Sequence, residues 1–300
     1  MSAIKRFIAR FYQQVMNSQR DAIFAAVIFS LLPMFGWLGA SIMALVTLRH
    51  GAKQGLVILF WMGLATGILA LFGWHDQFLY GFVFGSLIIW MLASVLAQTN
   101  SWNKVLQTAM LLGMLGVMLT HILVPNIHHY WYQLFAQYYF DADSIVSLPM
   151  SKAQMQELFK QIALIWTGVQ ASVFLLSNIG TLIIARWVQS MLYNPGGFGE
   201  EFLKLRMGRL TNLILLGLIA LSFTGYSVFW DMLPIPLVAF FVAGLSLIHA
   251  MVQHSKRQVL WLILFYMLLV LLFQYIMPAI VLLAITDSFI DIRKRLNLAG

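Results

Sequence analysis

Long apolar runs without a charged residue are the feature that most constrains what this chain can fold into. Residues 55–73, for example, contain no Asp, Glu, Lys or Arg. A helix of that length is about 28 Å long, close to the thickness of a bilayer's hydrocarbon core. Over the whole chain 61% of the residues are hydrophobic and 9% are charged, whereas a soluble domain has about 25% charged residues. The sequence therefore predicts an all-α fold, a polytopic transmembrane helical bundle.

Apolar runs bounded by charges, or by Pro and Gly, define the segments expected to enter the membrane. They are 22–33, 36–48, 55–73, 79–97, 105–124, 160–187, 207–230, 234–252, 258–275 and 278–296. We therefore expect about 8 to 10 membrane segments. Residues 22–48 and 258–296 each contain a proline, Pro33 or Pro278, so each either crosses once or forms a hairpin of two shorter helices.

The distribution of Lys and Arg favours two hairpins. With both hairpins in place, 16 of the 18 Lys and Arg lie on one side. Only Lys152 and Lys160 lie on the other side. A single span at 22–48 would separate the N-terminal cations from the rest. Because cations collect on the cytoplasmic side of membrane proteins, we predict that both termini are cytoplasmic. The shared side would hold Lys5, Arg6, Arg10, Arg20, Arg49, Lys53, Lys104, Arg186, Lys204, Arg206, Arg209, Lys256, Arg257, Arg293, Lys294 and Arg295.

The same segments predict the domain organisation. Residues 1–20 carry an apolar stripe at helical spacing beside Lys and Arg, which is typical of an interfacial amphipathic helix. Residues 21–300 would form a single transmembrane domain with an outer loop at 125–159 and an inner loop at 189–209. The outer loop is rich in aromatic residues, as in an interfacial belt, and Ser151 with Gln154 forms a capping-box signal.

Polar residues inside apolar segments are the candidates for a substrate or partner site. Asp287, Asp291 and Arg295 follow one another at four-residue steps, which places them on one helix face. They form either a structural anchor, with Asp291 paired to Arg295, or a functional site. The other candidates are Asn178, Thr181, Gln170, Asn212 and His249. Each either joins neighbouring helices by hydrogen bonds or lines a cavity.

The inner loop contains a second motif. Asn194, Pro195, Gly196 and Gly197 form a turn signal, and Glu201 and Arg206 follow in a short charged helix. We expect both glycines to adopt positive φ in a tight turn.

The sequence predicts neither a metal site nor a cofactor. Cysteine is absent, which excludes thiolate ligands. His128 and His129 with Asp141 and Asp143 match no metal-site spacing, and Asp231 at the end of an apolar run is expected to be solvated. No HExxH, GxSxG or phosphate-loop motif is present, so we predict that the chain is not an enzyme. The charge of +8 is explained by membrane topology, with no need for nucleic acid as a partner.

Two blocks carry a family resemblance. Residues 185–187 and 192–206, with Asn194-Pro195-Gly196-Gly197, and the closing residues 287–296 resemble the YybS-like bacterial membrane proteins (domain of unknown function 2232). That family is distantly similar to the substrate-binding components of energy-coupling-factor vitamin transporters. Residues 44–55 are similar to an early loop of those components, and Ala22 and Ala26 fit the Ala-xxx-Ala face that they use for docking. The resemblance implies a multi-pass protein of the bacterial inner membrane.

These expectations lead to two functional hypotheses. The first is a transporter-like substrate-binding or permease protein for a small molecule. The second is a membrane scaffold or assembly factor that acts through helix–helix contacts and the cytoplasmic 193–209 loop. The partners are then the lipid bilayer and either a small-molecule substrate or a membrane partner protein.

Overall fold

The computed structural model describes residues 3–32, 34–73, 77–140, 151–253 and 255–295, and all regular elements in these ranges are helices. Within these described ranges, six stretches are long and apolar enough to cross a membrane. They are Ala52–Leu71, Gly81–Thr99, Trp102–Leu123, Trp166–Tyr193, Ser227–Val252 and Phe273–Ile290. Arg209–Ser222 and Gln258–Leu271 are shorter apolar helices. The predicted all-α, multi-pass fold class is confirmed.

The helices form two compact units, which we describe separately. Unit 1 comprises residues 1–109 and 176–205, and unit 2 comprises residues 110–175 and 206–300. Unit 1 contains α1 (Ala3–Val15), α2 (Gln19–Leu31), α3 (Gly36–His50), α4 (Ala52–Leu71), α5 (Gln77–Thr99), α10 (Gly197–Leu203), the start of α6 (Trp102–Leu123) and the end of α9 (Trp166–Tyr193).

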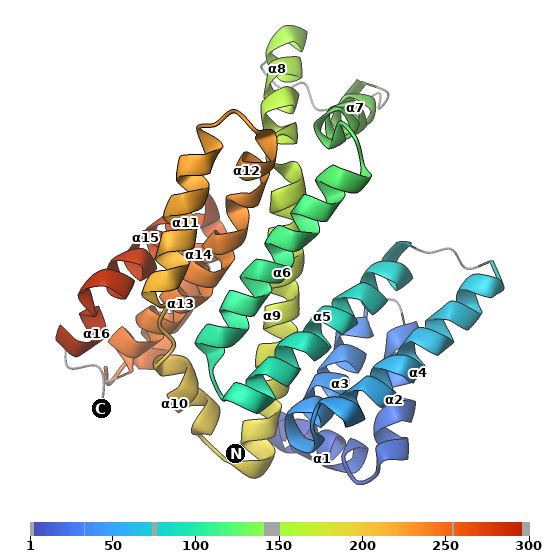
Figure 1. The fold of residues 1–300 in the computed structure, drawn as a ribbon. Coiled ribbons are helices and arrows are strands. Elements are labelled where there is room, and N and C mark those ends of the chain that lie inside the picture. Colours follow the sequence, from blue (N-terminus) through green and yellow to red (C-terminus); the bar gives the residue numbers. More distant parts are fainter. Residues whose placement is uncertain (1–2, 33, 74–76, 141–150, 254, 296–300) are drawn as a thin grey trace. The chain divides into compact units, whose positions relative to one another are not determined.

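Helix α3 is the centre of unit 1. Its residues 39–48 are all buried, and α2, α4 and α5 pack around it (Figure 1). Helix α2 approaches so closely that a Cβ on Gly39 would lie 2.6 Å from the carbonyl oxygen of Ala26. The two helices run antiparallel, since Gln19 at the start of α2 donates a hydrogen bond to Gln54, just beyond α3, at 2.7 Å. The predicted hairpin at 22–48 is therefore confirmed, although Pro33 lies outside the described residues.

The predicted N-terminal amphipathic helix corresponds to α1, whose apolar side packs within unit 1. Tyr12 is buried, and its hydroxyl lies 2.9 Å from the Ser41 hydroxyl of α3. Burial raises the pKa of Tyr12, and the hydrogen bond to Ser41 partly offsets this. Phe7 is exposed, which leaves an apolar side chain available for the membrane interface.

Unit 2 is built around α13. It contains the rest of α6 and α9 together with α7 (Ile127–Phe140), α8 (Lys152–Ala163), α11 (Arg209–Ser222), α12 (Ser227–Met232), α13 (Pro234–Val252), α14 (Gln258–Leu271), α15 (Phe273–Ile290) and α16 (Ile292–Arg295). In the most apolar 18-residue window of Ser227–Val252, 67% of the residues are buried, against 28–39% in the other candidate spans. Helix α15 packs closely on α13, since a Cβ on Gly244 would lie 2.4 Å from the Ile280 side chain.

The last hairpin turns at a different residue from the one predicted. Helix α14 ends before Leu272, α15 begins at Phe273, and Pro278 lies inside α15. Backbone hydrogen bonds explain this position. The Leu272 amide donates to the Leu268 carbonyl oxygen, which completes the last turn of α14, and the Leu272 carbonyl oxygen accepts the amides of Tyr275 and Ile276 at the start of α15. Pro278 removes one amide donor from α15 without ending the helix.

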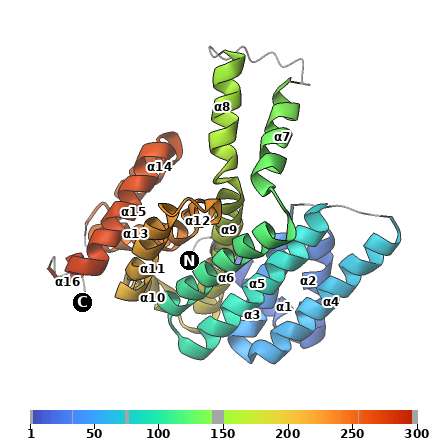
Figure 2. The ribbon, with the colours of Figure 1, turned by 45° about the horizontal axis from the view of Figure 1, so that its top comes forward.

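Helices α7 and α8 form a pair at one end of unit 2 (Figure 2). The Phe135 ring of α7 lies tilted by 50° against the Phe159 ring of α8 and packs edge-on against Trp166, with ring centroids 6.0 and 5.1 Å away. Several of the aromatic side chains that were expected to form an interfacial belt therefore pack between these helices. Tyr138 remains 76% exposed. The Ser151–Gln154 capping box is confirmed.

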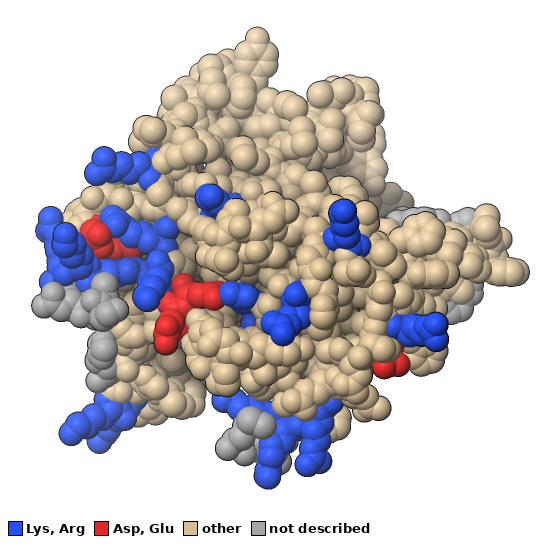
Figure 3. All heavy atoms as spheres, turned by 60° about the horizontal axis from the view of Figure 1, so that its bottom comes forward, with Lys and Arg blue, Asp and Glu red and all other residues tan. Residues whose placement is uncertain are grey.

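Cations in unit 2 gather at the end opposite to α7 and α8. Lys and Arg residues occur where α11 begins, where α13 turns into α14, and where α15 ends. Figure 3 shows many Lys and Arg side chains on the face seen from this end. Lys152 and Lys160 belong to α8 at the other end. This separation within one unit is what the positive-inside rule requires, and the cytoplasmic orientation stays a prediction.

Candidate functional site

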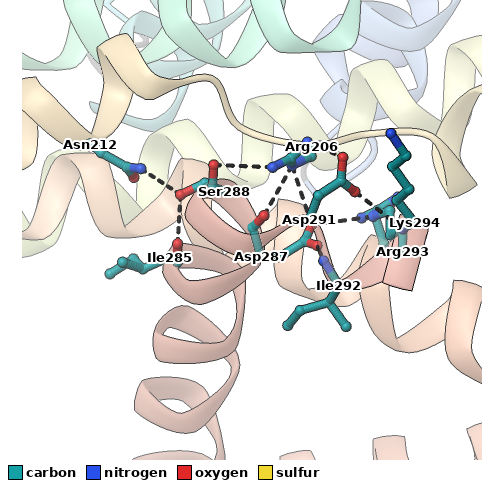
Figure 4. Close-up of polar contacts among 10 residues, drawn as sticks. Arg206, Asn212, Ile285, Asp287, Ser288, Asp291, Ile292, Arg293 and Lys294 are labelled. Carbon is teal, nitrogen blue, oxygen red and sulfur yellow. Dashed lines mark hydrogen bonds and ion pairs between the residues drawn. The ribbon is translucent and has the colours of Figure 1, made fainter. Parts of the chain in front are cut away.

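Asp287 lies in the last turn of α15, and its buried side chain contacts the residues that follow the helix. It is 2% exposed, and its carboxylate accepts the backbone amide of Ile292 at 2.9 Å and the Arg293 Nε at 3.3 Å (Figure 4). Arg293 is also buried and donates to the Ser246 hydroxyl of α13 at 3.1 Å. Burial lowers the pKa of Arg293, and the Asp287 carboxylate opposes that shift.

Arg206 approaches the same helix end from the segment that precedes α11. Its guanidinium donates to the carbonyl oxygens of Asp287 and Ser288 at 3.0 and 3.1 Å and to the Asp291 carboxylate at 2.7 Å (Figure 4). A cation is well placed here, because the last carbonyls of a helix carry partial negative charge. We call Arg206, Asp287, Asp291 and Arg293 the α15 clamp.

The clamp corrects the predicted ion pair. Asp291 does not pair with Arg295, because α15 ends at Asp291 in the left-handed conformation, with φ of 55°. The continuous helix face that the four-residue spacing assumed stops there. Arg206 is the partner of Asp291 instead, and Arg295 is exposed in α16.

Asn212 joins α11 to α15 beside the clamp. Its side-chain amide donates to the Ser288 hydroxyl, which in turn donates to the Ile285 carbonyl oxygen at 2.6 Å. Asn212 is 2% exposed. The structure therefore brings Arg206, Asn212, Asp287 and Asp291 together in one network that connects helices.

The inner-loop motif is a tight turn in unit 1. Gly196 has φ of +94°, as predicted, but Gly197 does not have positive φ. A Cβ on Gly197 would lie 2.2 Å from the side-chain amide nitrogen of Asn194, so the Asn194 side chain would have to turn away. Glu201 forms a bidentate ion pair with Arg186 of α9, in which Arg186 Nε donates to Glu201 Oε2 at 3.0 Å and Nη2 donates to Oε1. Pro195 lies exposed in the turn.

The remaining predicted residues are distributed along the helices. Asn178 and Thr181 are buried, and the Thr181 hydroxyl donates to the Ser177 carbonyl within α9. Gln170 is exposed. The Nδ1 atom of His249 lies 2.9 Å from the Leu245 carbonyl oxygen of the same helix.

Three residues that sequence reasoning did not group together meet near α7. Asp231 of α12 is completely buried, and one of its oxygens, Oδ2, lies 2.9 Å from His121 Nε2 and 3.6 Å from His128 Nε2. The two histidines come from the end of α6 and the start of α7. We call His121, His128 and Asp231 the His–His–Asp cluster. The expectation that Asp231 is solvated was wrong.

The other carboxylate oxygen of Asp231, Oδ1, accepts a hydrogen bond from the backbone of α9. The Gly168 amide donates to Asp231 Oδ1 at 2.6 Å. A Cβ on Gly168 would lie 1.6 Å from the Asp231 carbonyl oxygen, so only glycine allows α9 and α12 to approach this closely. Next to it, the Trp131 indole donates to the Thr167 hydroxyl at 3.0 Å, which fastens α7 to the same turn of α9.

One atom in the cluster differs from its neighbours. His128 Nε2 is buried and has no hydrogen-bond partner among the described residues, because 3.6 Å exceeds ordinary hydrogen-bond length. His129 takes no part, since its ring contacts Gln133 at 2.8 Å. Asp141 and Asp143, considered with these histidines as ligands, lie outside the described residues.

The sequence contained only a weak signal for this cluster. His121 and His128 are seven residues apart on either side of Pro125, and Asp231 is 110 residues from His121. No spacing rule joins residues so far apart in the chain. Comparisons of the chain with protein-family models, with curated proteins and with solved structures give no match.

Proposed function

We propose that the chain is a transporter-like membrane protein that binds a small, positively charged solute at the His–His–Asp cluster of unit 2. The observation that supports this is the completely buried Asp231 carboxylate, whose Oδ2 faces two imidazole rings. Ionisable groups in membrane segments are costly to bury and commonly belong to solute or ion pathways.

The α15 clamp and the His–His–Asp cluster each contain a buried carboxylate, and they can be compared atom by atom. Each carboxylate oxygen of Asp287 has a protein partner, and so does each oxygen of Asp231, so the two sites do not differ at the carboxylate. The His–His–Asp cluster leaves a buried imidazole nitrogen without a hydrogen-bond partner among the described residues. Five other buried side-chain atoms of the described residues also have no partner, among them Asn212 Oδ1 beside the clamp, so this nitrogen supports the proposal only together with the buried Asp231 carboxylate.

The Ala22 and Ala26 face, which the resemblance to transporter components suggested for docking, is not exposed to a partner. Ala22 and Ala26 are 1% and 0% exposed, because α3 covers them. A partner that docked on this face would have to displace α3 from the centre of unit 1.

Charge movement in reconstituted membranes tests the proposal. The purified chain, in liposomes adsorbed to a solid-supported membrane, is exposed in turn to Na⁺, K⁺, Mg²⁺, Mn²⁺, Zn²⁺ and a pH step. We expect a transient current with at least one of these cations, and a current about tenfold or more smaller for Asp231→Asn, which removes the buried negative charge.

Lys160→Gln is the matched control, because Lys160 is an exposed charge on α8 and should leave the current unchanged. If no cation gives a current above that of empty liposomes, the transport proposal is wrong. An equal current from Asp231→Asn would remove the cluster from the proposal.

A further inference from the structure

We infer that His121, His128 and Asp231 bind a divalent transition-metal ion of the Zn²⁺ class. This inference rests on the proposed function in that it takes the same site and names its ligand. It reaches beyond the sequence-based expectation, which grouped His128 with other residues and predicted no metal.

The distances fit a tetrahedral metal centre. Zinc binds imidazole nitrogen and carboxylate oxygen at about 2.0–2.2 Å, so two ligand atoms of a tetrahedron lie about 3.3 Å apart. The Asp231 Oδ2 atom lies 2.9 Å from His121 Nε2 and 3.6 Å from His128 Nε2. All three ligand atoms lie within 4.8 Å of one another. One metal ion can therefore contact all three after small side-chain adjustments.

The ligand types select the class of ion. Two imidazole nitrogens and one carboxylate oxygen suit Zn²⁺ and neighbouring transition metals. Ca²⁺ and Mg²⁺ prefer six or more oxygen ligands, which this cluster does not supply. Three protein ligands leave the fourth tetrahedral position for water or a solute, as in zinc sites that are not purely structural.

The surroundings orient the carboxylate for one metal bond. The Gly168 amide occupies Oδ1 of Asp231, which leaves Oδ2 directed at the two histidines. Hydrogen bonds of this kind to a ligand's second atom are typical of metal centres. Metal binding would also give His128 Nε2 the partner that it lacks among the described residues.

The two histidine side chains lie nearer the surface than the carboxylate. The side chains of His121 and His128 are 16% and 20% exposed, whereas Asp231 is fully buried. The histidines therefore form the outer side of the site, and the carboxylate forms its base.

Metal content and coordination test the inference on the full chain in detergent. Chelator-treated protein is dialysed against Zn²⁺ and its bound metal is measured by mass spectrometry. We expect one Zn²⁺ per chain. His121→Ala, His128→Ala and Asp231→Asn should each weaken binding by more than the roughly 10- to 100-fold that changes in surrounding residues cost.

His129→Ala is the matched control, since the neighbouring His129 contacts Gln133 instead of the cluster, and it should bind Zn²⁺ like the wild type. Co²⁺ provides a readout that needs no variant. The wild-type chain loaded with Co²⁺ should show the visible absorption of a four-coordinate centre with nitrogen and oxygen ligands, even if a variant fails to fold.

The outcomes separate the two proposals. A wild-type chain that binds no Zn²⁺, or that binds it equally well without the three ligands, overturns the metal inference. Zn²⁺ binding without any transient current supports the metal site and contradicts transport. A current carried by another cation without Zn²⁺ binding supports transport and contradicts the metal site.

Discussion

Substitution of Asp287 should lower the stability of the fold more than substitution of its exposed neighbours does. Asp287→Ala leaves the buried Arg293 guanidinium without its carboxylate partner, and breaking a buried ion pair costs about 3–5 kcal/mol. We expect a correspondingly lower thermal unfolding temperature in detergent, followed by circular dichroism. Arg295→Ala removes an exposed charge and should change stability by less than about 0.5 kcal/mol. Equal effects of the two variants would contradict a structural role for the clamp.

Gly168 and Gly180 make a matched pair on α9. A Cβ at Gly168 would overlap the Asp231 carbonyl oxygen, whereas a Cβ at Gly180 meets nothing within 4 Å. Gly168→Ala should therefore lower the unfolding temperature and reduce Zn²⁺ binding, because Asp231 must move. Gly180→Ala should stabilise the helix by about 0.5–1 kcal/mol. If both variants unfold like the wild type, the close approach of α9 and α12 is not required.

At the scale of elements, the inner-loop turn distinguishes two reasons for a glycine. Gly196→Ala places a side chain at φ of +94°, which costs about 1–2 kcal/mol. Gly197→Ala should cost stability through the clash with Asn194 instead. Gly199→Ala has free space and should be neutral or slightly stabilising. Unfolding temperatures of the three variants, measured side by side, check this order. A destabilised Gly199→Ala together with a neutral Gly196→Ala would contradict it.

Elements that depend on local sequence were predictable, and contacts between distant segments were not. Apolar run lengths, the Ser151 capping box and the α2–α3 hairpin follow from neighbouring residues and from charge distribution. The turn at Leu272 was misplaced because proline was expected to begin a helix, and no strong signal marks Leu272. Asp291 pairs with Arg206, which is 85 residues away, and Asp231 contacts Gly168, which is 63 residues away. Such pairs are decided by tertiary packing, which one sequence does not reveal.

For the whole molecule, the orientation in the membrane can be measured directly because the chain has no cysteine. Lys152→Cys on α8 and Lys204→Cys at the end of α10 each introduce one exposed thiol. We expect a membrane-impermeant maleimide to label Lys152→Cys on intact spheroplasts, and Lys204→Cys only after permeabilisation, because cations collect inside. The reverse labelling would place both termini outside.

The α15 clamp also has a consequence for how the chain is made. Synthesis proceeds from the N-terminus, and the carbonyl of Asp287 that receives Arg206 follows it by 81 residues. Until those 81 residues are made, the Arg206 guanidinium lacks its acceptors on α15. Helices α11, α13 and α14 are therefore inserted before these hydrogen bonds can form. The clamp closes only when α15 arrives, so a nascent chain interrupted before Asp287 carries an unmatched arginine.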